Sequence, residues 1–381
     1  MPQTDNAKLG QEWIRSRVLD TGLCTGCGAC VQLCPYQRRH KDQTVVLHAC
    51  DRLDGRCRLY CPRAPADFSR LRAALFEPGC LTDELGPVKG LYVTRAADPA
   101  IREKAQHGGT VSALLKLALE AGLIDRALVA GEQSNLLSLP TAAGSAQEAL
   151  AGAKSKFVVS STVAKFNEIS QQGGQGIGAV ATGCQALALA KMRANPWPGD
   201  EERVGRLKLV IGLFCGWTLD WHKISALLSE KVGRATILGM DVPPSGHACM
   251  EVYTDQGVVE IPIDEVNPCV REACRYCFDM TAEFADLSVG GSRSPAGWET
   301  DKGWNQVIVR SAAGQELLDL AREKGALEFR ETPPGNLAKL KKASAAKKKA
   351  CLASLCELTG SEEDLVYLDC RDRVVCAIRE K

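Results

Sequence analysis

The stretch CTGCGACVQLCP, residues 24–35, decides how the first part of this chain folds. It places Cys24, Cys27 and Cys30 at intervals of three residues, and it places a fourth cysteine, Cys34, directly before a proline. In the bacterial ferredoxin run, three cysteines at this spacing hold one [4Fe-4S] cluster, and the fourth binds the other cluster. The stretch therefore predicts a ferredoxin-like domain with two clusters.

The second half of that motif follows in CDRLDGRCRLYCP, residues 50–62. It departs from the ferredoxin pattern, because Asp54 stands where the middle cysteine belongs and Cys50 is one residue early. A carboxylate or solvent ligand would also permit a three-iron form. Structural zinc takes four thiolates too, but it requires neither the interleaved spacing nor the two Cys-Pro pairs. We expect one cluster on Cys24, Cys27, Cys30 and Cys61, and a second on Cys34, Cys50, Cys57 and either Asp54 or Cys80.

Composition limits the kind of protein that this chain can be. Its 381 residues, 45% of them hydrophobic, can form about two or three domains with substantial cores. A net charge of +1 provides no basic field that would draw the protein onto nucleic acid. There is no apolar run of membrane-spanning length and no signal-peptide core, which predicts a cytoplasmic protein. In that compartment, eighteen cysteines indicate metal centres rather than disulfides.

The distribution of residue types predicts three parts. Residues 1–85 are expected to form the ferredoxin-like domain, residues 86–332 an α/β domain with a mixed sheet, and residues 333–381 a short helical tail. In this tail, the run Lys347–Lys349 is interpreted as the solvated face of a helix. The tail cysteines Cys351, Cys356, Cys370 and Cys376 have irregular spacing, which fits free thiols at least as well as a further cluster.

Periodicity predicts the elements of the central part. Strand-like apolar runs occupy residues 90–96, 126–132, 156–161, 178–183 and 207–216. The clearest helix lies within 108–125, where Val111, Leu114, Leu115 and Ala118 share one face. Gly122 stands where the C-terminal cap of this helix belongs.

Four further cysteines are candidates for a metal site. Cys184 and Cys215 each follow a strand-like run, and the ends of strands are where α/β sheets place their sites. Cys274 and Cys277 form a Cys-x-x-Cys pair, followed by the pattern of a short apolar-acidic helix. The spacing of this pair alone permits a zinc hook, a redox dithiol or half of an iron-sulfur site.

Six motifs in order resemble the coenzyme F420 hydrogenase/dehydrogenase beta-subunit family, whose members carry FAD and iron-sulfur clusters. The motifs are GGTVSALLKLALEAGLID (108–125), SKFVVSS (155–161), GAVATGCQALAL (178–189), IGLFCGW (211–217), ACRYCFDMTAEFADLSVGG (273–291) and GWNQVIVRSAAGQELLDLAREKGALE (303–328). The resemblance runs from about residue 20 to residue 330. It implies a third [4Fe-4S] cluster on Cys184, Cys215, Cys274 and Cys277, with Cys269 as a rival ligand.

The same resemblance implies where FAD would bind. A glycine turn at a helix start lets the backbone approach a phosphate and presents free N–H groups to it. The residues expected to hold the flavin are Gly108, Gly109, Thr110, Ser112, Lys156 and Ser160, with a second cradle at Gly290, Gly291, Ser292 and Arg293. His107 and His222 are interpreted as structural, although His107 could touch the flavin. No catalytic acid or base is predicted, and Asp279 and Asp286 are expected to support neighbouring groups.

Two positions depart from the family pattern. Gly183 stands where the family usually has a proline, and the segment VPPSGHACMEV, residues 242–252, lacks the usual basic residues. The second departure weakens the prediction that the acidic coenzyme F420 itself is the substrate.

The resemblance implies a flavin-dependent iron-sulfur oxidoreductase subunit. It would pass electrons between a soluble carrier at FAD, coenzyme F420-like or a ferredoxin, and a partner in a hydrogenase, formate dehydrogenase or heterodisulfide-reductase-like complex. FAD connects two-electron hydride donors with one-electron clusters. Two alternatives are an electron-transfer adaptor without a hydride acceptor and a reductase of an organic substrate.

Overall fold

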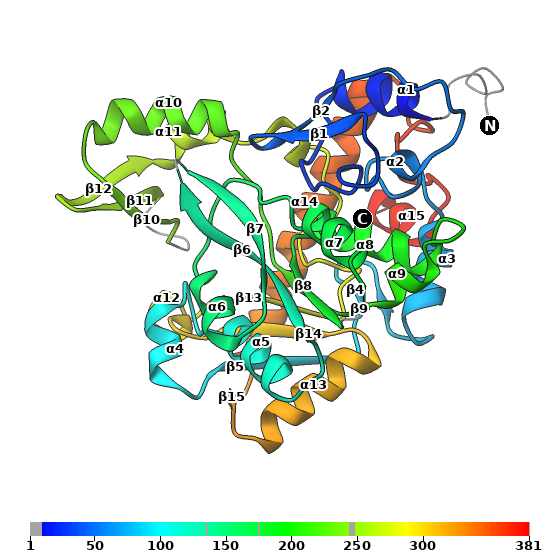
Figure 1. Cartoon of the computed structure of the whole chain (residues 1–381). Coiled ribbons are helices and arrows are strands. Elements are labelled where there is room, and N and C mark those ends of the chain that lie inside the picture. Colours follow the sequence, from blue (N-terminus) through cyan, green and yellow to red (C-terminus); the bar gives the residue numbers. More distant parts are fainter. Residues whose placement is uncertain (1–9, 135, 174–175, 244–247, 381) are drawn as a thin grey trace.

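The computed structural model describes residues 10–134, 136–173, 176–243 and 248–380, so part of the segment 242–252 lies outside the described residues. An eight-stranded mixed sheet forms its centre (Figure 1). Its strands are β5 (Gly90–Ala96), β6 (Arg126–Ser134), β7 (Leu137–Ala143), β8 (Ile177–Ala181), β9 (Leu207–Leu213), β13 (Leu287–Gly291), β14 (Asn305–Val309) and β15 (Leu327–Arg330). They lie in the order β15-β5-β14-β13-β9-β8-β6-β7.

Four neighbouring strands of this sheet, β13, β9, β8 and β6, are parallel. Strand β14 is antiparallel to both β13 and β5, so β5 runs in the same direction as the four. The carboxyl ends of all five strands therefore meet at one edge, where α/β folds bind their ligands. We call this edge the carboxyl edge.

Helices cover both faces of the sheet. Helices α5 (Thr110–Glu120) and α13 (Ala312–Glu323) pack on one face, with Leu114 and Leu318 fully buried in the shared core. Helices α7 (Thr162–Ser170) and α8 (Gly183–Ala194) belong to the core on the other face. Shorter helices are α4 (Pro99–Lys104), α6 (Ala146–Ala151), α9 (Glu201–Gly205) and α12 (Trp298–Asp301).

The N-terminal segment packs against α7 and α8 instead of standing apart. Its aromatic residues Trp13, Tyr60 and Phe68 are buried in the same core as α8. Arg56 pairs with Asp200 at 2.9 Å and so ties this segment to the loop before α9. The elements are α1 (Gln11–Ile14), the π-helix η1 (Arg15–Leu19), β1 (Gln37–His40), β2 (Gln43–Val46), α2 (Arg56–Leu59), α3 (Phe68–Leu75), β3 (Leu81–Thr82) and β4 (Gly86–Pro87).

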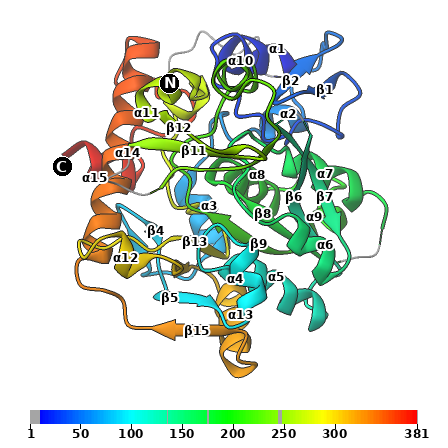
Figure 2. The ribbon, with the colours of Figure 1, turned by 90° about the vertical axis from the view of Figure 1, so that its left-hand side faces the viewer.

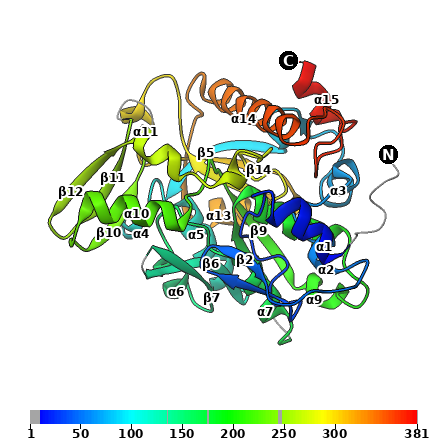
Figure 3. The same ribbon diagram turned by 90° about the horizontal axis from the view of Figure 1, so that it is seen from above.

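A second, small sheet lies at one side of the molecule, away from α3 (Figure 3). Its antiparallel strands β10 (Ile237–Asp241), β11 (Cys249–Thr254) and β12 (Gly257–Pro262) share a separate core with α10 (Trp221–Val232). The chain then returns to the main sheet through α11 (Ile263–Val266) and the 3-10 turns η2 (Asn267–Cys269) and η3 (Glu272–Cys274).

The C-terminal residues form the 24-residue helix α14 (Asn336–Thr359) and the helix α15 (Arg373–Glu380). Figure 2 shows α14 running along one side of the molecule, with α15 beside it. Leu352, Leu355 and Ile378 join the core that contains α8. The interpretation of the lysine run as a solvated face is wrong for Lys348, which is fully buried against Glu283. Among the described residues, no helix has the length and apolar character needed to cross a bilayer.

Most predicted elements of the central part are confirmed. The predicted helix is α5, with Gly109 in the left-handed region at its start and Gly122 at φ +68° after its end. Residues 156–161 do not form a strand: Phe157 has φ +57°, and only Val158 makes a bridge, to Leu219. Residues 278–286 form no helix either, because the Asp279 carboxylate accepts the N–H groups of neighbouring residues in a turn.

Candidate functional site

Five cysteines of the N-terminal segment line one small cavity, Cys57 among them, and the other four form what we call the first thiol group: Cys24, Cys27, Cys30 and Cys61. Burial raises the pKa of Cys27 and of Cys30, and the charges of neighbouring thiols raise both pKa values further. Burial also raises the pKa of Cys61, opposed by the positive charge of Lys191. The sulfurs of Cys27, Cys30 and Cys61 thus lie in an interior that disfavours free thiolates, which a bound metal cluster would stabilise.

The loop of the first thiol group is held in place by one buried side chain of α7. The Asn167 amide donates to the carbonyl oxygens of Gly28, Ala29 and Val31, at 3.3, 3.2 and 2.8 Å. Gly28 has φ +86°, and a Cβ there would lie 2.7 Å from the Cβ of Ala164. The motif therefore needs glycine where the loop turns against α7.

A second thiol group consists of Cys34, Cys50 and Cys57. Burial raises the pKa of Cys57 to about 11, and the charges of Cys34, Cys61 and Cys50 also act on it. Asp54, expected as one possible fourth ligand, is exposed to solvent. The fourth ligand of this group stays a prediction.

The structure brings together four cysteines that are far apart in the sequence, and we call them the central thiol group: Cys184, Cys215, Cys274 and Cys277. Burial raises the pKa of Cys215, and the charges of the three other thiols contribute in the same direction. Cys184 follows β8 and Cys215 follows β9, so both lie at the carboxyl edge. The N–H of Cys215 donates to Met280 O at 2.9 Å, which brings the segment of the Cys274–Cys277 pair to the same edge. Cys269, the rival ligand, is buried instead in the core of the small sheet.

Backbone and side-chain groups orient these sulfurs. The N–H of Thr218 donates to Cys274 Sγ at 3.3 Å, and Thr182 Oγ1 lies 3.4 Å from Cys184 Sγ. A Cβ on Gly183 would lie 2.8 Å from Asp279 Oδ2, which explains why a glycine fits here. Asp279 and Asp286 both accept backbone N–H groups, as expected for supporting residues.

Three cations accompany the first and central groups, the buried Lys191 and Arg63 and the half-buried Lys347. Lys191 Nζ donates to Cys61 O at 2.7 Å, and Lys347 Nζ donates to Cys215 O at 2.7 Å. Arg63 lines the cavities of both groups, and its backbone N–H donates to Cys61 Sγ at 3.4 Å. Although burial raises the pKa of Cys277, the charges of Lys347 and Arg63 outweigh it and lower that pKa. These cations compensate negative charge in the interior.

The first thiol group adjoins both of the others, because Arg63 lines its cavity and that of the central group, and Cys57 of the second group lines its cavity too. Cys184 of the central group acts electrostatically on Cys27 of the first group. Cys61 of the first group acts in the same way on Cys57 of the second group. The first group therefore lies between the other two. The donor set of the first and central groups, four thiols each, fits a [4Fe-4S] cluster. Among the described residues, no group of three or more His, Cys, Asp or Glu side chains could hold a single metal ion.

The two glycine pairs predicted for the flavin face one another at the carboxyl edge. A Cβ on Gly108 would lie 2.8 Å from Asn305 Oδ1, and Asn305 Nδ2 donates to Gly290 O at 3.2 Å. A Cβ on Gly291 would lie 3.1 Å from His107 Nε2. Both pairs thus adjoin the same few side chains, where an added Cβ would collide with the protein.

Three of the predicted flavin side chains already bond within the protein, and one of them is Lys156, whose Nζ donates to Ala153 O at 3.0 Å. Thr110 is fully buried, and its hydroxyl lies 2.9 Å from that of Thr94. The Ser292 hydroxyl donates to Asp301 Oδ1 at 3.1 Å. Ser112 lies half-buried in the first turn of α5.

The loop with Lys156 and Ser160 borders the same edge. The N–H of Ser155 donates to Gln106 Oε1 at 3.0 Å, which places this loop beside His107. Lys156 is half-buried, and the buried Ser160 hydroxyl has no hydrogen-bond partner among the described residues. The loop therefore carries one cation, which is bonded to the backbone, and one hydroxyl without a partner among the described residues.

Sequence reasoning missed the residues that support the thiol groups. Arg63 follows the Cys-Pro pair directly, but nothing in the local pattern shows that it reaches the central group. The sequence does contain a signal that Lys347 faces the interior, because Lys347, Cys351 and Leu355 recur every four residues and so lie on one face of a helix. The lone amide of Asn167 has no sequence signature.

Three family models match the chain. Two of them describe the beta subunit of coenzyme F420 hydrogenase/dehydrogenase: residues 91–166 match the model for its N-terminal part, and residues 174–334 match the model for its C-terminal part. Residues 17–37 match a 4Fe-4S binding domain, which includes three cysteines of the first thiol group and Cys34.

Individual proteins agree with these models. The chain is 32% identical to the coenzyme F420 hydrogenase subunit beta of Methanothermobacter thermautotrophicus, over 69% of this chain and 92% of that relative. It is 27% identical to the coenzyme F420-dependent sulfite reductase of Methanocaldococcus jannaschii, over 87% of this chain but only 51% of that relative. Among solved structures, a chain of the F420-reducing [NiFe] hydrogenase complex from Methanosarcina barkeri superposes with a TM-score of 0.65 at 25% identity, over 74% of this chain and 94% of that chain.

Proposed function

This chain belongs to the coenzyme F420 hydrogenase/dehydrogenase beta-subunit family, and on that premise we propose that it passes electrons between a soluble carrier and a partner protein through FAD and three iron-sulfur clusters. It is an F420-related iron-sulfur oxidoreductase subunit. The proposed carrier is coenzyme F420 or a ferredoxin, and the proposed partner belongs to the same redox complex.

The observation that carries this proposal is that the first thiol group adjoins both of the others. Since the first group contacts both others electrostatically, the central, first and second groups form a route from the carboxyl edge to the N-terminal surface. Potentials of such clusters depend on charge, hydrogen bonds to sulfur and burial, all of which this chain supplies. Each thiol group would hold one cluster.

The flavin would lie at the carboxyl edge, next to the central thiol group. A Cβ on Gly290 would collide with the ring of Phe214, and Phe214 directly precedes Cys215. When bound, FAD exchanges a hydride with a two-electron carrier and single electrons with a cluster. The half-buried Lys156 would pair with its phosphates, and the glycine pairs would allow close approach of the backbone.

The second thiol group would be the exit to the partner. Tyr36 and Leu47 are large hydrophobic residues that stay exposed, and the N–H of Leu47 donates to Tyr36 O at 2.8 Å. Both residues lie within three positions of Cys34 or Cys50. Exposed apolar side chains near a redox group suit a protein-protein contact.

One experiment tests the whole proposal: anaerobic purification, quantification of iron, zinc and flavin, and then reduction by coenzyme F420, NAD(P)H or ferredoxin. We expect a brown protein with FAD and iron for three cubane clusters. Stoichiometric zinc with little iron would refute the clusters. Full iron without flavin would favour the adaptor instead, and reduction of an organic substrate would favour the third function considered above.

A paired substitution tests the flavin site. Lys156→Met should lower the flavin content and leave the iron content unchanged, because it removes the cation proposed to meet the phosphates. Lys154→Met is the matched control, since Lys154 is exposed only two residues away. Equal flavin content in both variants would indicate that the phosphates bind at another part of the carboxyl edge.

A further inference from the structure

We propose that Lys347, on the C-terminal helix α14, raises the reduction potential of the cluster held by the central thiol group. This inference rests on the proposed function, because it requires a cluster at that group. Helix α14 begins after residue 334, where the match to the family model ends. The effect would therefore come from a part of this chain that the family models do not cover.

The ammonium group of Lys347 is fixed next to the central group. Lys347 Nζ donates to the carbonyl oxygens of Cys215 and Gly216, both at 2.7 Å. Its charge acts on three sulfurs of the group, those of Cys277, Cys215 and Cys274. The lysine therefore approaches the site from the side of the loop that follows β9.

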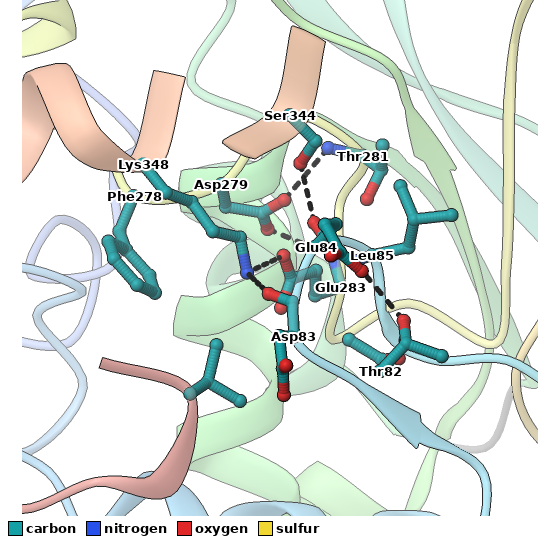
Figure 4. A network of polar contacts seen from close by, with 12 residues as sticks. Thr82, Asp83, Glu84, Leu85, Phe278, Asp279, Thr281, Glu283, Ser344 and Lys348 are labelled. Atoms are coloured by element: carbon teal, nitrogen blue, oxygen red, sulfur yellow. Dashed lines mark hydrogen bonds and ion pairs between the residues drawn. The ribbon is translucent and has the colours of Figure 1, made fainter. Parts of the chain in front are cut away.

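The neighbouring turn of α14 is anchored so that Lys347 cannot easily move away. Figure 4 shows Lys348 pointing into the interior, where its Nζ lies 2.6 Å from Glu283 Oε1 and donates to Asp83 O at 3.0 Å. One turn earlier, the Ser344 hydroxyl donates to Glu84 O at 2.6 Å (Figure 4). These contacts tie α14 both to the segment before β4 and to the turn that follows Cys277.

Breaking the anchors would be costly. Lys348 is fully buried, and an ion pair in the interior is strongly destabilising when one partner is removed. The cation of Lys347 is thus held by the fold itself, and its position does not depend on a flexible surface side chain.

A fixed cation at this place favours the reduced cluster. A [4Fe-4S] cluster gains one negative charge when it takes up an electron, and the attraction of a nearby positive charge is strong where water is excluded. Arg63 contributes a second cation from the ferredoxin-like side, because its charge also lowers the pKa of Cys277. Lys347 would therefore make the central cluster easier to reduce than the same cluster would be without a cation beside it.

The test is a redox titration of the whole chain, purified anaerobically and followed by electron paramagnetic resonance. The signal of the central cluster is identified as the one that Cys274→Ala removes. In Lys347→Met the midpoint potential of this signal should become more negative, while iron content and the signals of the other clusters stay as in the parent. Lys347→Arg keeps the charge and should restore most of the parent potential.

Lys349→Met is the matched control, because Lys349 belongs to the same lysine run but is exposed. It should leave every midpoint potential unchanged. An unchanged central potential in Lys347→Met with full iron would overturn the inference and leave the proposed function intact. Loss of the central iron in both Lys347→Met and Lys347→Arg would make Lys347 a structural residue and overturn it too. A parent chain without a central cluster would defeat the proposed function itself.

Discussion

The first and central thiol groups reach a similar chemical environment by different means. Three of the four cysteines of the first group come from one loop of seven residues, 24–30, and a single amide from α7 fixes that loop. The central group takes its cysteines from three segments that meet only after β8, β9 and β13 have formed one sheet. A local motif needs little support from the fold, whereas a dispersed site depends on the whole sheet.

The largest expected effect comes from removing one ligand of the central group. Cys274→Ala should lose the central cluster but keep FAD and the N-terminal clusters, because the other sites do not share this cysteine. The carrier should still reduce the flavin, and transfer onward should stop. Stopped-flow absorbance would show flavin bleaching without cluster reduction.

Iron content decides between a cluster and the other interpretations of this cysteine pair. Full iron content in Cys274→Ala would mean that Cys274 and Cys277 form a redox dithiol and hold no cluster. A general loss of folding would indicate a structural metal. Cys269→Ala is the control, since Cys269 lies in a different core and should not change the iron content.

The reciprocal change tests the order of the groups. Cys61→Ala removes a ligand of the first group, which lies between the other two, so electrons should reach the central cluster and stop there. Freeze-quench spectra should then show a reduced central cluster and an oxidised second cluster. Reduction of the second cluster at the parent rate would show that the route bypasses the first group.

A smaller effect is expected from the support of the local motif. Asn167→Ala removes three hydrogen bonds to the ferredoxin loop and leaves buried carbonyls unpaired, which costs about 1–3 kcal/mol of stability. The first cluster should become labile to a chelator, while the central cluster stays. Gln171→Ala is the control, because that exposed side chain donates to Gln32 O only at the end of the loop. Equal rates of iron loss to the chelator in both variants would mean that the loop keeps its conformation without the hydrogen bonds from Asn167.

The same contrast explains what could be predicted from the sequence. The Cys-x2-Cys-x2-Cys run and the periodicity of α5 are local patterns, so the ferredoxin-like segment and the mixed α/β fold were predicted and are confirmed. The four cysteines of the central group were grouped by resemblance, since no local spacing links Cys184 to Cys277. Lys348 was misjudged, because burial of a lysine depends on tertiary partners such as Glu283.

The smallest expected effect probes the carboxyl edge beside the central group, at His107. Burial lowers the pKa of His107, and the charge of Arg293 lowers it further, while Asp241 opposes both. Its Nδ1 is buried and has no hydrogen-bond partner among the described residues. Because the folded state disfavours the charged ring, the unfolded chain takes up the proton first as the pH falls below the ordinary histidine pKa of about 6.5. The parent should therefore lose stability between about pH 7.5 and about pH 5.5.

His107→Gln should lose less stability over that interval, because glutamine takes up no proton in either state. Thermal unfolding of both proteins at the two pH values would measure the difference, with exposed His222→Gln as the control for a histidine on the surface. Equal losses in parent and His107→Gln would mean that the ring is protonated without cost in the folded protein. The carboxyl edge would then tolerate a positive charge next to Gly291, and a flavin phosphate, rather than an uncharged part of the cofactor, would be the group that suits this position.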